Sequence, residues 1–145
     1  PIQTPVSPNG KNMVTANTLT GTITILDTAT DEIVAMLPCD PGCHGVQYGA
    51  KLGGGYYAYV TSKFSNRMLV VDPDPNNDGN PADAAIVGSI GLFATNRTLK
   101  DATISGNAGM GGQGILPVPV VYNGWVQKLP SNWSNLLTPA QRNPW

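Results

Sequence analysis

The heptapeptide GTITILD (residues 21–27) has the clearest strand pattern in the chain and indicates the fold class. From Thr22 to Leu26 polar and apolar side chains alternate, and most of them are β-branched, which predicts a half-buried β-strand. A second stretch, NRMLVVD (residues 66–72), repeats the closing Asp about 45 residues later. Its continuous apolar run predicts a strand that is packed on both faces. The chain is therefore expected to consist largely of short strands.

Further strands flank both stretches and make two similar units. The predicted strands are residues 10–17, 21–27 and 32–37 in the first unit and residues 55–62, 66–72 and 84–90 in the second. Val14 aligns with Val60, and Asp27 aligns with Asp72. A period of about 45 residues suits four short strands per unit. Helix signals are nearly absent before residue 130, so we predict an all-β fold of antiparallel sheets.

Several motifs recur in a fixed order between about residues 5 and 92. The order is SPNGK (7–11), VTAN (14–17), TITILDTATDEIVA (22–35), Pro38 and HGV (44–46), with YVTS (59–62) repeating the signature in the second unit. This order resembles the YVTN-type β-propeller repeat, a family related to the propellers of cytochrome cd1 nitrite reductase and nitrous-oxide reductase. The resemblance implies antiparallel, four-stranded blades around a central channel. The chain departs from the pattern through extra residues between Pro38 and His44, and through residues 48–52, which replace the usual turn.

The chain is too short for a complete propeller, which typically has four to eight blades. Residues 1–92 match two blades, the first lacking its innermost strand; residues 93–130 are expected to form a divergent third blade or an extension, and residues 131–145 a tail. Two to three blades leave sheet edges open. We therefore expect a C-terminal fragment or one chain of a split protein, completed by another polypeptide. A self-contained small β domain with two similar sheets is the alternative.

The composition disfavours several classes of function. Charged residues make up 12% of the 145 residues and the net charge is −1, so there is no electrostatic basis for binding nucleic acid. No apolar stretch approaches the ~18 residues of a membrane span. The chain lacks an initial Met and a signal peptide, so a mature, processed or excised chain is expected. A single His and the absence of a G-x-S-x-G turn disfavour a serine hydrolase.

Both cysteines and the only histidine lie within PCDPGCHGV (residues 38–46), and three interpretations are open. Cys39 and Cys43 can form a disulfide that pins the inserted loop. Alternatively, the spacing is one residue longer than the C-x-x-C-H pattern of c-type haem attachment, with His44 as the proximal ligand. The second axial ligand would come from another chain or from Met13, Met36, Met68 or Met110. In the third interpretation, His44 or the thiolates bind copper or zinc together with ligands from a partner.

The propeller resemblance bears on these interpretations. It implies that the HGV segment opens an innermost strand, which would bring His44 near the central channel, where the related redox enzymes hold copper or haem. Two closely spaced cysteines also fit an oxidising compartment, so we expect a periplasmic or extracellular protein.

The loop DPDPNNDGNPAD (residues 72–83) has the opening spacing of a calcium-binding loop. Asp74, Asn76 and Asp78 provide oxygen atoms at alternate positions, and the following Gly allows a sharp turn. The oxygens available to complete the ligand shell are those of Asp72, Asn80 and Asp83. The usual Glu at the twelfth position is replaced by Ala85. The alternative is a polar loop whose Asp, Asn, Gly and Pro residues only make turns.

Together these features predict a propeller portion of an extracytoplasmic redox metalloprotein, acting in electron transfer or as part of an oxidoreductase. Cys39, Cys43 and His44 would contribute to a haem or copper site, and the loop at residues 72–83 would hold calcium. The opposing prediction is a non-catalytic binding or structural propeller at a cell surface, with a Cys39–Cys43 disulfide and no redox centre.

Overall fold

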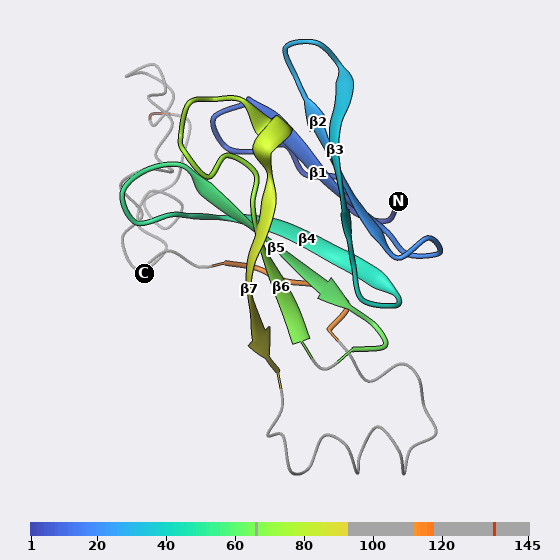
Figure 1. Cartoon of the computed structure of the whole chain (residues 1–145). Helices are drawn as coiled ribbons and strands as arrows, with labels where there is room; N and C mark the ends of the chain where they lie inside the picture. The colour runs from blue at the N-terminus through green and yellow to red at the C-terminus, as the bar shows by residue number, and fades with distance from the viewer. Residues whose placement is uncertain (66, 93–111, 118–134, 136–145) are drawn as a thin grey trace, which may run out of the picture.

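The computed structural model describes residues 1–65, 67–92, 112–117 and 135, and its regular structure is almost entirely strand (Figure 1). The elements are β1 (Asn12–Asn17), β2 (Thr22–Asp27), β3 (Glu32–Pro38), β4 (Cys43–Ala50), β5 (Tyr56–Ser62), β6 (Arg67–Asp72), the short 3-10 helix η1 (Pro81–Asp83) and β7 (Ala85–Gly91). The predicted all-β class is confirmed. The predicted third blade or extension at 93–130 and the tail at 131–145 lie outside the described residues, except for 112–117 and 135.

The strands form two antiparallel sheets in which each strand pairs with the next one along the chain. The strand orders are β1-β2-β3 and β4-β5-β6-β7. In the first sheet Ile25 pairs with Val14 on one side and with Ala35 on the other. In the second sheet Tyr59 lies between its partners on β4 and β6. Two consecutive meanders of three and four strands are consistent with an incomplete propeller-like fold.

Residues 48–50 belong to β4 and not to the altered turn that the sequence suggested. The side chain of Tyr48 is only 1% exposed, and its burial keeps the chain extended through this position. The turn to β5 falls instead on residues 51–55, where Gly53, Gly54 and Gly55 have φ values of 90°, 111° and 77°. Because side chains disfavour such positive φ angles, this glycine run suits the turn.

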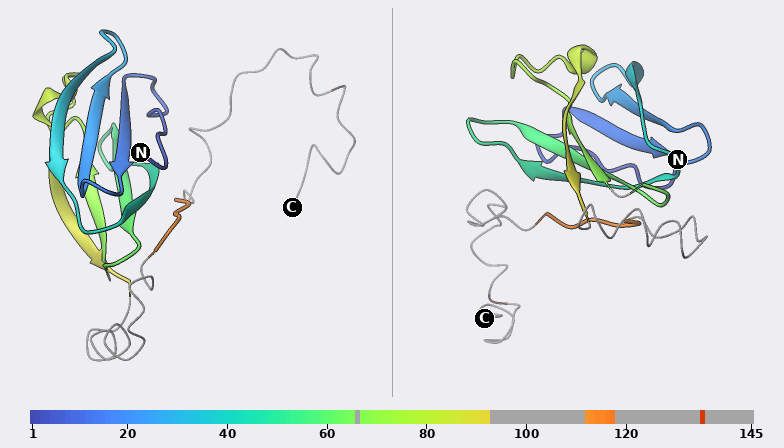
Figure 2. Two further views of the ribbon diagram at one scale, coloured as in Figure 1. Left: turned by 90° about the vertical axis from the view of Figure 1, so that its right-hand side faces the viewer. Right: turned by 60° about the horizontal axis from the view of Figure 1, so that its bottom comes forward.

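The hydrophobic core lies between the two sheets, which Figure 2 shows as adjacent layers. Alternate residues of each strand face this core, so the period of two fixes which side chains are buried. The largest apolar contributions come from Val14, Ile23, Ile25, Val46, Tyr48, Val60, Leu69 and Val71. The opposite face of the first sheet is open at β3, where Ile33 and Met36 are 62% and 60% exposed, whereas Thr15 and Thr24 on the same face are buried.

The N-terminal segment runs along the free edge of β1. Its backbone bonds are Ile2 N–H to Ala16 O (3.2 Å), Ala16 N–H to Gln3 O (3.4 Å) and Val14 N–H to Pro5 O (3.3 Å). An isolated bridge between Val6 and Met13 continues this pairing. Pro5 has no N–H to donate, which helps explain why the segment is irregular. The first sheet therefore has three named strands, with residues 1–6 lying irregularly in the fourth position.

Candidate functional site

A disulfide between Cys39 and Cys43 closes the loop that joins β3 to β4, with 6.3 Å between the two Cα atoms. This is the first of the three interpretations of PCDPGCHGV. Gly42 has a φ of 77° in the tight turn, and a side chain there would meet the ring of Phe64 at 2.7 Å. Cys43 is fully buried in the core. With both sulfurs in the disulfide, neither is available to attach haem or to bind a metal as a thiolate.

An ion pair holds the same loop to β6. The Arg67 guanidinium donates two hydrogen bonds to the Asp40 carboxylate, at 2.7 Å from Nε and 2.6 Å from the terminal nitrogen. The hydroxyl of Ser65 donates a third bond, at 2.6 Å. The bond from Arg67, reinforced by Ser65 and partly opposed by burial, lowers the pKa of Asp40 below its usual value. This bidentate geometry fixes the loop in register with the second sheet.

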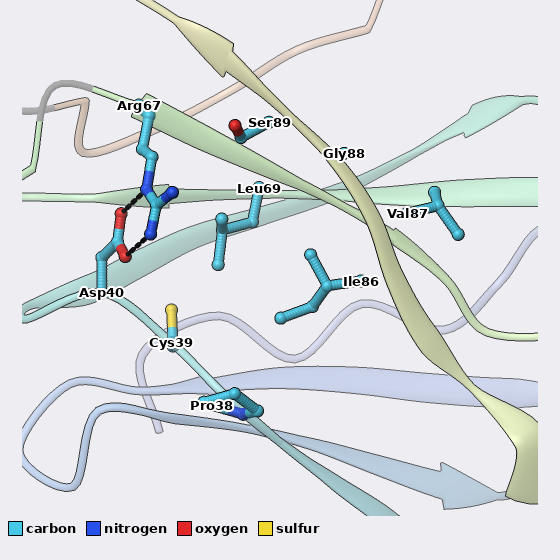
Figure 3. A pocket seen from close by; sticks show the side chains of 9 residues that line it. All are labelled: Pro38, Cys39, Asp40, Arg67, Leu69, Ile86, Val87, Gly88 and Ser89. Atoms are coloured by element: carbon cyan, nitrogen blue, oxygen red, sulfur yellow. Dashed lines mark hydrogen bonds and ion pairs between the residues drawn. The ribbon is translucent and has the colours of Figure 1, made fainter.

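The disulfide loop borders an open cleft of about 380 Å³ between the end of β3, the first half of β6 and the middle of β7 (Figure 3). Leu69 and Ile86 provide apolar walls, and the Asp40–Arg67 pair provides a charged rim. The cleft residues are Pro38, Cys39, Asp40, Arg67, Leu69, Ile86, Val87, Gly88 and Ser89. Because Asp40 already occupies two donors of Arg67, the cleft offers no uncompensated positive charge for an anion.

His44 lies in β4 directly after the disulfide. Its Nδ1 is 2.7 Å from the carbonyl oxygen of Gln113. A carbonyl oxygen only accepts, so Nδ1 is the donor of this bond and Nε2 takes no part in it. Metal-binding histidines are usually oriented by such a second bond. Within the described residues, however, no three His, Cys, Asp or Glu side chains lie close enough to share a metal ion. Any metal on His44 would therefore need ligands from outside this part of the chain.

The acidic loop after β6 begins with a buried ion pair that the sequence analysis did not identify. Lys51 Nζ lies 2.9 and 3.2 Å from the two carboxylate oxygens of Asp72 and 3.1 Å from the carbonyl oxygen of Asp74. The side chains of Lys51 and Asp72 are only 8% and 7% exposed. Asp72 is thus already paired with a cation. The Lys in the 48–52 segment was visible in the sequence, but only the fold brings it to Asp72.

The remaining predicted calcium ligands mainly shape the loop itself. Their side-chain oxygens accept main-chain N–H groups further along the chain: Asp74 from Gly79, Asn76 from Asp78, Asp78 from Asn80, and Asn80 from Ala82. Asn80 thereby caps η1, and Asp83 lies inside that helix. The exception is Asp74 Oδ1, which is buried and has no hydrogen-bond partner among the described residues.

The described residues contain no helix of the length and apolar character needed to cross a membrane. Neither the protein-family models, nor the curated proteins, nor the solved structures with which the chain was compared give a match.

Proposed function

We propose that this chain is part of an extracytoplasmic β-propeller that acts as a binding or structural module and is completed by another polypeptide. The observation that carries the proposal is the pair of consecutive meander sheets packed through one core. The other face of the first sheet exposes Ile33 and Met36, which are apolar side chains of the kind that a neighbouring blade buries. The Cys39–Cys43 disulfide supports an oxidising compartment and leaves no thiolate for redox chemistry.

The test is native mass spectrometry of the protein isolated from its own source. We expect a complex with a second polypeptide in a fixed ratio. The Met36→Lys variant should dissociate it, because the charge would be buried in the interface. The matched control is Val87→Lys, since Val87 is 52% exposed but lies on the other sheet, in β7. A monomer in the native preparation, or equal effects of both variants, would contradict the proposal.

A redox metal centre at the propeller hub is the second candidate, and the hydrogen bond of His44 favours it. Because Nδ1 is engaged by the Gln113 carbonyl oxygen, Nε2 is the imidazole nitrogen that remains to bind copper or haem iron. Electron paramagnetic resonance of the isolated complex with added Cu²⁺ should show nitrogen coupling that disappears in His44→Gln. Identical spectra of the two proteins would exclude His44 as a copper ligand. Intact mass of the same sample under non-reducing conditions should show the Cys39–Cys43 disulfide and no covalent haem.

Calcium binding by the loop at residues 74–80 is a separate part of this proposal. It is supported by Asp74 Oδ1, a buried oxygen without a hydrogen-bond partner in the described part of the chain. Added Ca²⁺ should raise the melting temperature relative to chelator, and Asp78→Ala should remove that increase. Asp31→Ala is the control, because Asp31 lies in the turn between β2 and β3. Equal melting temperatures with calcium and with chelator would reject calcium binding.

A further inference from the structure

The extended segment of residues 112–117 lies against the outer face of β4 and β5, opposite to the core. Figures 1 and 2 draw this segment in orange beside the second sheet. The face is formed by residues 45, 47 and 49 of β4 and by their neighbours 57, 59 and 61 of β5, which alternate with the buried residues. Thr61 is only 3% exposed although it points away from the core. In a stack of sheets, this is the face on which a following blade would pack.

Two glycines of β4 make room for the segment. A Cβ at Gly45 would lie 2.7 Å from the carbonyl oxygen of Gln113 and 2.9 Å from the Cα of Gly114. A Cβ at Gly49 would lie 3.2 Å from the Cβ of Pro117. Distances to backbone atoms below 3.0 Å cannot be accommodated without a shift of the chain. The two positions therefore form a shallow groove that accepts an extended backbone because it lacks side chains.

Within the segment, Gly112 is itself packed closely against its neighbours. A Cβ at Gly112 would already lie 3.3 Å from Thr61 and from the side chain of Leu92, whereas a Cβ at Gly114 would meet nothing within 4 Å. The carbonyl oxygen of Gln113 accepts the Nδ1–H of His44 at 2.7 Å. Packing against β5 and a directed hydrogen bond from β4 thus fix the same short segment on the second sheet.

A similar bond links β4 to the N-terminal segment. Gln3 Oε1 accepts the main-chain N–H of Val46 at 2.8 Å, and residues 1–6 hydrogen-bond along β1. In both cases a side chain of one extended segment bonds the backbone of the next. Residues 1–6, β4 and residues 112–117 therefore form a series of three neighbouring extended segments.

We infer that residues 112–117 occupy the position of the innermost strand of a third blade, docked in a groove that Gly45 and Gly49 build on β4. What this position implies for assembly of the ring rests on the proposed propeller function. Under that function, His44 belongs to the second innermost segment and its side chain bonds the third. The completing polypeptide then adds beyond residues 112–117 at one end of the chain and on the face of Ile33 and Met36 at the other. It does not pack directly on the face of β4 and β5.

The experiment uses ¹⁵N- and ¹³C-labelled full-length chain, in which His44 gives the only imidazole signals. In the wild type we expect the Nδ1–H tautomer and a nuclear Overhauser effect between the Thr61 methyl group and the α-protons of Gly112. The Gly112→Val variant should shift His44 to a mixture of tautomers, because its Cβ would lie only 3.3 Å from Thr61 and the further methyl groups would crowd the segment. The matched control, Gly114→Val, should keep both signals.

A wild-type His44 in the Nε2–H form, or the absence of the Thr61–Gly112 contact, would overturn the inference without any variant. It would also fail if Gly112→Val and Gly114→Val gave the same spectra. Should Gly112→Val not fold, the wild-type measurement decides the question. These readouts need no partner, so docking of residues 112–117 and formation of a complex can fail independently.

Discussion

Tyr48 of β4 donates a hydrogen bond of 2.6 Å to the side-chain oxygen of Asn12 in β1, across the core between the two sheets. Both residues are almost completely buried. Burial raises the pKa of Tyr48 well above its usual value, so the hydroxyl keeps its proton at neutral pH. A buried polar pair of this kind aligns two sheets in a way that apolar contacts do not, because a hydrogen bond is directional.

Removing this hydroxyl should destabilise the fold. Tyr48→Phe leaves the Asn12 oxygen buried without its donor, and we expect the free energy of unfolding to fall by about 1–3 kcal/mol. Chemical denaturation measures the loss. Tyr57→Phe, on the outer face of β5, is the control. A double-mutant cycle with Asn12→Ala tests the assignment, since strictly additive losses would show that the two side chains are not coupled.

The Asp40–Arg67 ion pair should make the disulfide loop sensitive to acid. The pKa of Asp40 is lowered in the folded chain, so its contribution to stability is complete above the unfolded-state pKa of about 4. That contribution is lost as the pH falls through the lower folded-state pKa. The difference in melting temperature between wild type and Arg67→Gln should therefore be clear at neutral pH and shrink in acid. A difference that stays constant with pH would argue against the pair.

Removing only one of the two charges of the buried Lys51–Asp72 pair should strongly lower the free energy of unfolding. Lys51→Met leaves a carboxylate with 7% exposure and no counter-charge, and we expect a loss of about 3–5 kcal/mol. Lys11→Met, at an exposed lysine, should be almost neutral. The double variant Lys51→Met/Asp72→Leu should recover most of the loss, because no charge then remains buried. If the second substitution did not restore stability, the loss in Lys51→Met would come from lost packing and not from the unpaired carboxylate.

The Cys39–Cys43 disulfide should give only a modest stabilisation. The loop it closes is short, and the chain-entropy model gives about 2 kcal/mol for such a ring. Denaturation with and without reductant measures the effect on the native chain. The Cys39→Ala/Cys43→Ala variant should not respond to reductant. If the stability of the wild type also does not change with reductant, then its cysteines are not bonded to each other.

Local pattern was sufficient to predict most of the strands. The alternation at residues 22–26 predicted β2, and the apolar run before Asp72 predicted β6, because strand periodicity is a property of neighbouring residues. The same local pattern suggested a turn at Tyr48. Tyr48 is buried by the opposite sheet, and the residues next to it in the sequence do not indicate that contact. The local pattern also left three interpretations of Cys39 and Cys43 open.

Residue order alone was enough to predict the all-β class, the two similar units and the residue types of the candidate sites. Which of those residues meet depends on how the sheets pack. Lys51 meets Asp72, Tyr48 meets Asn12, and His44 meets Gln113, which is 69 positions further along the chain. Periodicity encodes which face of a strand is buried, but the partner on that face is selected by how the sheets stack. Contacts between distant residues are therefore set by packing.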